Sequence, residues 1–313
     1  MLQQTQVTTV IAYYTRFLDR FPDVRALAEA PLDDVLALWS GLGYYSRARN
    51  LHRCAQAVVA DHGGRFPNRS QTLATLPGIG RSTAAAIAAF CFGERVAILD
   101  GNVKRVIARA VGFDGDLAMA PQERALWARA QALLPDRDVD VYTQGLMDLG
   151  AGPCSPRAPR CGDCPLAAVC VAHRDGRPEA YPVKSRRLKR GTREHTLLWL
   201  RHRGRVRLTR RPEHGVWAGL WSLPEWDDAQ TLATLAAAWP GEGQVLPAIR
   251  HALTHLDWTL RPLRWDLPAR TSPAVIARVD AALPPGRWFT TDEALASSLP
   301  APIRKLIAHE RND

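Results

Sequence analysis

The stretch Leu76-Pro77-Gly78-Ile79-Gly80, which continues into Arg81-Ser82-Thr83, decides the fold of the first half of the chain. It separates a short helix that we expect Ser70 to cap from an Ala-rich helix predicted over 82–92. Glycines let the backbone approach a phosphate closely, and the exposed N–H groups at a helix start point toward it. The stretch therefore favours a helix–hairpin–helix that contacts nucleic acid, with an ordinary turn between two helices as the alternative.

Residues 1 to about 135 are predicted to form helix after helix around this hairpin. The first helix should end before Pro22, and its apolar residues recur at spacings of three and four, which makes one helical face. These residues are Leu2, Val7, Val10, Ile11, Tyr14, Phe17 and Leu18. After residue 194 the pattern alternates as strands do, over 196–200, 206–209, 217–224 and 255–260, with a helix near 231–239.

The sequence thus predicts a mainly α helix–hairpin–helix domain over 1–175, a basic linker over 176–193 and a separate α+β domain over 194–313. The 313 residues are enough for two domains that each bury a core. Within the linker, residues 184–193 hold six basic side chains and no acid. Such a run is typical of a linker or of a solvated charged segment, and one segment can be both.

The overall charge of the chain is +10, which indicates a polyanionic partner because each neutralised phosphate releases counterions. A generally basic proteome without any nucleic-acid role is the alternative. No run of about 18 apolar residues is present, so we expect no membrane span. The first residues lack a basic start and a small-residue cleavage site, so we expect no signal peptide. We also expect a cytoplasmic, nucleoid-associated protein that is a monomer.

Four of the six cysteines lie within 17 residues in the spacing Cys-x6-Cys-x2-Cys-x5-Cys. They are Cys154, Cys161, Cys164 and Cys170. Four thiolates in a proline-rich loop form a soft site that suits an iron–sulfur cluster or zinc, and this pattern favours a reducing compartment. Paired disulfides or unliganded cysteines are the alternatives. Arg157 and Arg160 in the same loop are candidate phosphate contacts, with a solvated loop as the alternative.

A second informative run is Val96-Ala97-Ile98-Leu99-Asp100-Gly101-Asn102-Val103-Lys104-Arg105. Asp100 ends an apolar segment about twenty residues beyond the hairpin, which would hold its carboxylate at the rim of a dry cleft. It can equally be the N-cap of a helix from Gly101, and the two roles are compatible.

Several motifs together resemble the MutY family of adenine DNA glycosylases. In chain order they are MLQQTQV at 1–7, GLGYYSRARNLH at 41–52, LPGIGRSTA at 76–84, ILDGNVKRV at 98–106, MDLGA at 147–151 and the cysteine segment. The resemblance covers the whole chain, and it is stronger in the first 175 residues.

The resemblance implies a helix–hairpin–helix glycosylase domain with a 4Fe–4S cluster on the four cysteines, followed by a Nudix-like domain. It implies removal of adenine mispaired with 8-oxoguanine or guanine in double-stranded DNA, with the adenosine flipped into a pocket. Asp100 would stabilise the oxocarbenium-like sugar, and Asn102 would orient it. The related endonuclease III-type enzymes carry a Schiff-base lysine where this chain has Ser82, so the resemblance implies a monofunctional glycosylase.

The implied DNA contacts come from the first domain and the cysteine loop. They are Gln3, Gln4, Tyr44, Leu76, Gly78, Gly80, Arg81, Lys104, Arg157 and Arg160. For Tyr44 a core aromatic is the alternative. In the second domain, Leu253-Thr254-His255 replaces the family's Phe-Ser-His turn, which recognises 8-oxoguanine. The glutamate-rich metal helix of active Nudix hydrolases is missing from 225–240, so we expect no pyrophosphate hydrolysis.

The family's general acid is a glutamate two residues before the position of Met1, and no substitute is evident within the chain. We therefore expect the 313 residues to excise adenine poorly. Either a misassigned start or a real truncation would explain why the glutamate is missing. Two further readings stay open, an endonuclease III-like glycosylase/lyase and a non-catalytic mismatch-binding protein.

Overall fold

The computed structural model describes residues 1–2, 5–185 and 190–309. The chain divides into two compact units, Ala57–Arg187 on the one hand and Met1–Gln56 together with Leu188–Asp313 on the other. The division falls within helix α4 (Ser46–His62). Gln3 and Gln4, two of the expected DNA contacts, lie outside the described residues.

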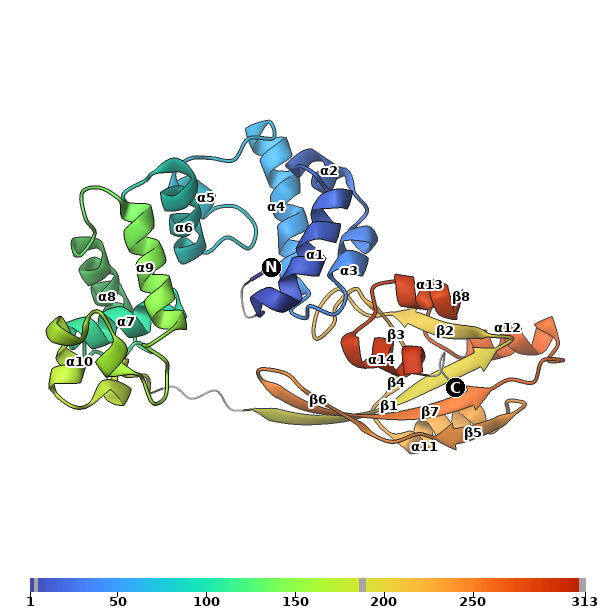
Figure 1. Cartoon of the computed structure of the whole chain (residues 1–313). Coiled ribbons are helices and arrows are strands. Elements are labelled where there is room, and N and C mark those ends of the chain that lie inside the picture. The colour runs from blue at the N-terminus through green and yellow to red at the C-terminus, as the bar shows by residue number, and fades with distance from the viewer. Residues whose placement is uncertain (3–4, 186–189, 310–313) are drawn as a thin grey trace. The chain divides into compact units, whose positions relative to one another are not determined.

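The unit formed by Ala57–Arg187 is helical (Figure 1). Its elements are α5 (Ser70–Leu73), α6 (Arg81–Phe92), α7 (Gly101–Val111), α8 (Ala120–Ala132), α9 (Val139–Ala151), α10 (Val171–Arg174) and the 3-10 turns η1 (Cys161–Asp163), η2 (Ala167–Val169) and η3 (Pro178–Ala180). Helix α7 lies at the centre, because Val103, Ile107 and Ala108 are buried in one cluster with residues of α6, α8 and α9. We call this the helical unit.

The second unit, which we call the sheet unit, contains an eight-stranded sheet. Its strands are β1 (Gly191–His202), β2 (Arg205–Arg210), β3 (Trp221–Ser222), β4 (Glu225–Trp226), β5 (Glu242–Val245), β6 (Ile249–Ala252), β7 (Leu256–Asp266) and β8 (Gly286–Thr290). The order is β3-β2-β1-β7-β5; β4 also pairs with β1, β6 with β7 and β8 with β2. The central pair β1–β7 is parallel, and the other pairs are antiparallel.

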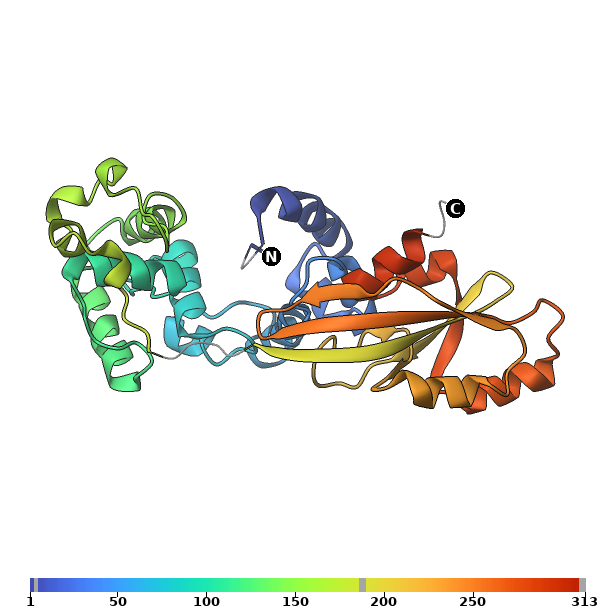
Figure 2. The same ribbon diagram turned by 90° about the horizontal axis from the view of Figure 1, so that it is seen from below.

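Helices cover both faces of this sheet (Figure 2). They are α11 (Ala229–Ala236) and α12 (Pro273–Ala281) on one face and α13 (Thr291–Ala296) and α14 (Ala301–His309) on the other. Side chains alternate along β1 as a strand requires: Leu198 and Leu200 pack with α11 and α12, while Leu197 and Trp199 share a cluster with α14. Because the sheet is covered on both faces, residues 197–200 of β1 are all apolar and buried, where the sequence had indicated an alternating strand.

The first helices, α1 (Val7–Arg20), α2 (Val24–Glu29) and α3 (Leu32–Trp39), also belong to the sheet unit. The hydroxyls of Ser40 and Tyr45 donate to the Leu299 carbonyl at 2.7 and 3.0 Å, and Arg210 pairs with Asp33 at 2.6 Å. Phe17, Trp39 and Trp199 lie in one buried cluster. The compact units therefore do not follow the expected division at 175 and 194.

Several expected details differ in the structure. Ser70 is not a cap: it is the first residue of α5, and its N–H and hydroxyl both donate to the Glu94 carboxylate. Of the expected apolar face of the first helix, only Val10 and Phe17 are buried. Residues 217–224 contribute a two-residue strand rather than a long one, because Trp217 has φ +57°.

The expected linker is shorter than predicted. Strand β1 already starts at Gly191, and residues before 186 are bonded to the helical unit. The Leu117 N–H donates to the Val183 carbonyl at 3.0 Å, and the Ser185 N–H donates to the Asp116 carboxylate at 3.1 Å. Among the residues that the structure describes, no helix is long and apolar enough to cross a membrane.

Candidate functional site

The turn between α5 and α6 has the geometry that its glycines indicate. The Ile79 N–H donates to the Leu76 carbonyl at 3.1 Å, and Gly78 has φ +76°. Pro followed by a residue with positive φ is the pattern of a type II turn, so glycine is required at position 78. Gly78 and Gly80 are exposed, which leaves their backbone open to a ligand. Leu76 is buried, so its side chain supports the turn, and its expected contact with DNA stays a prediction.

Asp100 lies at the start of α7, directly after the buried segment Ala97–Leu99. Its Oδ1 accepts the Val103 N–H at 2.7 Å, which confirms the expected N-cap. The preceding residue is fixed as well, because the Leu99 N–H donates to the Ser82 hydroxyl at 3.1 Å. Oδ2 of Asp100 accepts no hydrogen bond from any residue that the structure describes, so one carboxylate oxygen is held and the other is free to face a ligand.

Asn102 has a different partner from the expected one. Its side-chain oxygen accepts from Arg105 at 2.9 Å, and the same guanidinium donates to the Gly150 carbonyl at 2.7 Å and the Cys154 carbonyl at 2.8 Å. A Cβ at Gly150 would lie 2.6 Å from Asn102 Cβ, so glycine is what lets α9 approach the start of α7. Arg105, held by Asn102, therefore joins the start of α7 to α9, and no hydrogen bond between Asn102 and the Asp100 carboxylate is seen among the described residues.

The cysteine segment is held by a second buried arginine of α7. Arg109 is 2% exposed; it donates to the Ser155 carbonyl at 2.7 Å, the Pro156 carbonyl at 3.1 Å and the Tyr181 carbonyl at 3.2 Å. Its Nη1 lies 3.4 Å from Cys154 Sγ, and its own carbonyl lies 3.4 Å from Cys170 Sγ. Arg109 thus fixes both ends of the cysteine segment on the helix that begins at Asp100.

The four cysteine thiols form one electrostatic group. Burial raises the pKa of the Cys161 thiol, the thiols of Cys170, Cys154 and Cys164 raise it further, and Arg109 lowers it. All four cysteines are free thiols, so the disulfide alternative is not supported. Among the described residues, no three His, Cys, Asp or Glu side chains converge on the position of a single metal ion.

The expected phosphate contacts of this unit differ in their exposure and in their present partners. Arg157 is exposed, and Arg160 is exposed with Asp163 at 3.4 Å. The Arg81 guanidinium lies 3.9 Å from the centre of the Trp127 ring. Lys104 forms an ion pair with Glu123, so it is less available for DNA than its place in the motif indicates.

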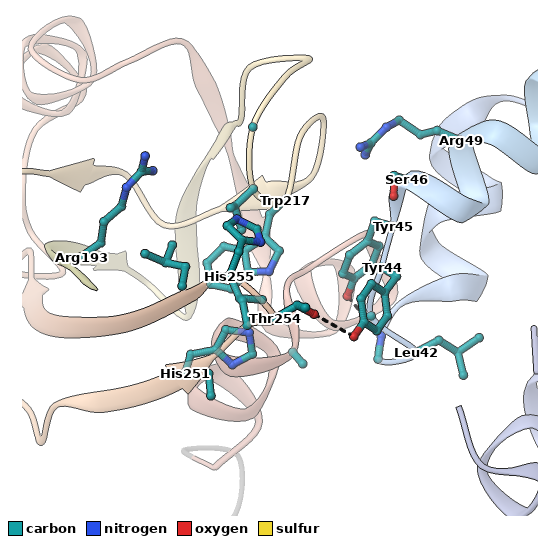
Figure 3. Close-up of a pocket in the computed structure, with 18 residues that line it drawn as sticks. Leu42, Tyr44, Tyr45, Ser46, Arg49, Arg193, Trp217, His251, Thr254 and His255 are labelled. Atoms are coloured by element: carbon teal, nitrogen blue, oxygen red, sulfur yellow. Dashed lines mark hydrogen bonds between the residues drawn. The ribbon is translucent and has the colours of Figure 1, made fainter. Parts of the chain in front are cut away.

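A pocket of about 950 Å³ lies within the sheet unit (Figure 3). The turn before α4 forms one wall with Tyr44, and the turn between β6 and β7 forms the other with Leu253, Thr254 and His255. The Tyr44 and Thr254 hydroxyls are 3.1 Å apart and hydrogen-bonded. Tyr44 is 46% exposed, which excludes the core-aromatic reading. Residues expected to act around the lesion from two distant motifs are thus neighbours.

An aromatic stack that the sequence did not indicate lines the same pocket. The Trp217 ring lies 5.3 Å from His251 and stacks on Trp258 at 4.7 Å, with an interplanar angle of 21°. Arg49 of α4 donates to the Ala218 carbonyl at 2.6 Å and so holds the strained turn at Trp217. Arg105 and Arg109 were also missed. Their i, i+4 spacing on an apolar helix that also buries Val106 and Ala108 is the signal that could have found them.

The chain is similar in sequence to known repair proteins along almost its full length. Residues 1–132 match the HhH-GPD superfamily base excision DNA repair protein model, and residues 195–309 match the NUDIX domain model. An adenine DNA glycosylase of Buchnera aphidicola is 31% identical over 98% of this chain and 87% of its own length. The chain belongs to the MutY family of adenine DNA glycosylases. The human member is 31% identical over 98% of this chain and 66% of its own length.

Membership of this family makes the chain a base excision repair DNA glycosylase, an enzyme that hydrolyses N-glycosyl bonds. The solved structure of a thermostable thymine-DNA glycosylase is similar as well, with a TM-score of 0.50 and 29% identity over 56% of this chain and 80% of that one. The expected fold class, a helix–hairpin–helix glycosylase domain followed by a Nudix-like domain, is confirmed.

Proposed function

We propose that this glycosylase removes adenine mispaired with 8-oxoguanine or guanine in double-stranded DNA. The observation that carries the proposal is Asp100, whose carboxylate has one oxygen held by the Val103 N–H and the other free. The residue before Asp100, Leu99, is bonded to Ser82, which follows a turn whose backbone is exposed for a phosphate. The name of the relatives, adenine DNA glycosylase, indicates which base is removed.

In this proposal the free oxygen of Asp100 faces the deoxyribose of the flipped nucleotide. As the glycosidic bond lengthens, positive charge develops on the sugar, and a fixed carboxylate stabilises it without having to reorganise. Ser82 contributes by holding the Leu99 N–H, which sets the chain direction into Asp100. In this proposal Asp100 and Ser82 account for the stabilisation of the sugar during bond cleavage.

We further propose that the enzyme is monofunctional. A lyase needs an amine nucleophile that forms a Schiff base with the abasic sugar. Residue 82 is a serine, and its hydroxyl is engaged with the Leu99 N–H. Hydrolysis should therefore leave an intact strand with an abasic site. Endonuclease III-like lyase activity would instead yield a covalent adduct on borohydride treatment.

We propose that the four cysteines hold a 4Fe–4S cluster, because four thiolates in one loop form the soft sulfur site that such clusters use, with zinc as the alternative. The thiols of Cys154, Cys164 and Cys170 all raise the pKa of the Cys161 thiol, as neighbouring ligands of one site would. The cluster would organise the loop that carries Arg157 and Arg160, with no direct part in breaking the glycosidic bond. Arg109 would donate to the Cys154 sulfur beside it.

The pocket of the sheet unit is the proposed site for the base opposite adenine. Thr254 and His255 keep the hydroxyl and the imidazole of the family turn, and Tyr44 is hydrogen-bonded to Thr254. Leu253 cannot stack as an aromatic would; Trp217 and His251 supply aromatic surface in the same pocket.

The test is a single-turnover assay with excess enzyme on duplexes that contain adenine opposite 8-oxoguanine, guanine or thymine. We expect alkali-labile sites to accumulate faster in the first two duplexes, with no strand cleavage before alkali and no borohydride-trapped adduct. Equal rates on all three duplexes would contradict the proposed substrate. Preferential binding of the 8-oxoguanine duplex without any excision would favour the mismatch-binding reading.

A further inference from the structure

Apart from its tyrosines, the ionisable side chains that line the pocket of the sheet unit are all basic. Its lining includes basic side chains and no Asp or Glu. The basic residues are Arg49, Arg193, His251 and His255. Two of its walls, at Tyr44 and at Trp217, are aromatic. An acid-free, basic and aromatic pocket matches the chemistry of a nucleic-acid strand, whose phosphates need cations and whose bases have π faces.

The neighbouring strands show that unpaired arginines are unusual here. Within the part of the chain that the structure describes, the other arginines of β1 and β7 all have carboxylate partners. Arg201 and Arg264 each lie 3.1 Å from an Asp266 oxygen, and Arg261 pairs with Glu194. The carboxylates of this sheet thus pair with the arginines of β1 and β7 that do not line the pocket.

Arg193 is the exception among them. It is exposed, it lies opposite Trp258 in the β1–β7 register, and its side chain has no carboxylate or hydrogen-bond partner among the described residues. An exposed arginine without a partner is ordinary in isolation. At the edge of an acid-free pocket it is an uncompensated cation with its guanidinium fork still available, and that fork fits two oxygens of one phosphate.

Arg49, the other arginine of the pocket, has a different part. Its guanidinium is half-buried and donates to the Ala218 carbonyl at 2.6 Å, and burial lowers its pKa. It positions the turn that carries Trp217. Of the two arginines that line this pocket in the described part of the chain, Arg193 is therefore the one available to a strand (Figure 3).

We propose that Arg193 binds a backbone phosphate of the strand opposite the excised adenine, next to the nucleotide held at Tyr44 and Thr254. This inference rests on the proposed function and adds to it a phosphate contact from the sheet unit. The contact sets the register of the opposite strand in the pocket, and it reads no base by itself.

The experiment compares Arg193→Gln with Arg261→Gln, which removes the same charge from a paired arginine of the same sheet. Equilibrium binding to an adenine:8-oxoguanine duplex is measured across a range of salt concentrations. Arg193→Gln should weaken binding about threefold to tenfold at moderate salt and lower the slope of log K against log salt by about one. Arg261→Gln should leave the slope unchanged.

A second arm locates the phosphate. Neutral methylphosphonates replace the phosphates on both sides of 8-oxoguanine, or in a matched duplex those on both sides of adenine. Wild type and Arg193→Gln should bind the first duplex equally, while the difference between them persists on the second. Equal salt slopes for wild type and Arg193→Gln, or a difference that disappears only on the second duplex, would overturn the inference and leave the proposed function intact. Failure of the wild-type chain to prefer mispaired DNA would remove both.

Discussion

The start of α7 is held by contacts between residues close in the chain, whereas the pocket of the sheet unit is held by contacts between residues far apart in it. Asp100 is fixed by groups that are close in the chain. Its carboxylate accepts the Val103 N–H three residues later, and the residue before it, Leu99, donates to the Ser82 hydroxyl seventeen residues earlier. The pocket is closed by Tyr44 and Thr254, which are 210 residues apart. The comparison teaches that the carboxylate proposed to react depends on one local motif, whereas the pocket depends on packing between the first helices and the sheet.

The largest expected effect tests the local side of this comparison. Asp100→Asn keeps the N-cap, because an asparagine oxygen can accept the Val103 N–H, but it removes the negative charge. We expect single-turnover excision to fall by about 10²–10³-fold with little change in the melting temperature. Asp228→Asn, the same change at the N-cap of α11, is the matched control and should leave the rate unchanged. Retention of near-normal excision by Asp100→Asn would remove Asp100 from its assigned role.

The second prediction concerns the buried arginines of the two units. Arg109→Met removes the guanidinium that holds Ser155, Pro156 and the Cys154 sulfur. We expect a loss of about 2–3 kcal/mol of unfolding free energy together with lower bound iron per chain. Arg207→Met, at an equally buried arginine bonded to Asp280 in the sheet unit, is the control. It should destabilise the protein without changing iron content, and equal iron loss in both variants would argue against a specific role of Arg109.

Sequence patterns indicated the local site well because its signals are local. The hairpin turn, the N-cap at Asp100 and the spacing of the four cysteines each depend on residues near one another in the chain. Arg105 and Arg109 were missed because an arginine in a sequence reads as a surface or phosphate-binding residue, and only the structure shows both buried against backbone carbonyls.

The sheet unit was harder to predict because the contacts that hold it are not local in the chain. The grouping of residues 1–56 with the sheet depends on contacts such as Ser40 to Leu299 and Asp33 to Arg210, for which no local pattern exists. Residues 217–224 alternate as a strand does, yet Trp217 takes a positive φ because its ring stacks on Trp258 and its turn is held by Arg49. Tertiary packing outweighs the local β preference at this position.

The third prediction tests how tightly α9 must approach the start of α7. Gly150→Ala places a methyl group 2.6 Å from Asn102 Cβ, so either helix has to shift. We expect a loss of about 1–3 kcal/mol in unfolding free energy and slower excision, since the shift acts two residues from Asp100. Gly145→Ala on the same helix meets nothing within 4 Å and serves as the control. It should be neutral or slightly stabilising, and matching destabilisation of both variants would mean that α9 tolerates no substitution for reasons unrelated to Asn102.

The smallest effect is expected at the pocket, where an exposed hydrogen bond joins the two distant segments. Tyr44→Phe and Thr254→Val each remove one hydroxyl of the pair that is 3.1 Å apart. Because the bond is exposed to water, each change should weaken binding of 8-oxoguanine duplex by no more than about tenfold. If the hydroxyls act on DNA as a pair, the double variant should bind no worse than the weaker single variant, as a double-mutant cycle measures. Additive losses would mean that each hydroxyl contacts DNA independently, and the link between the first helices and the β6–β7 turn would then come from packing alone.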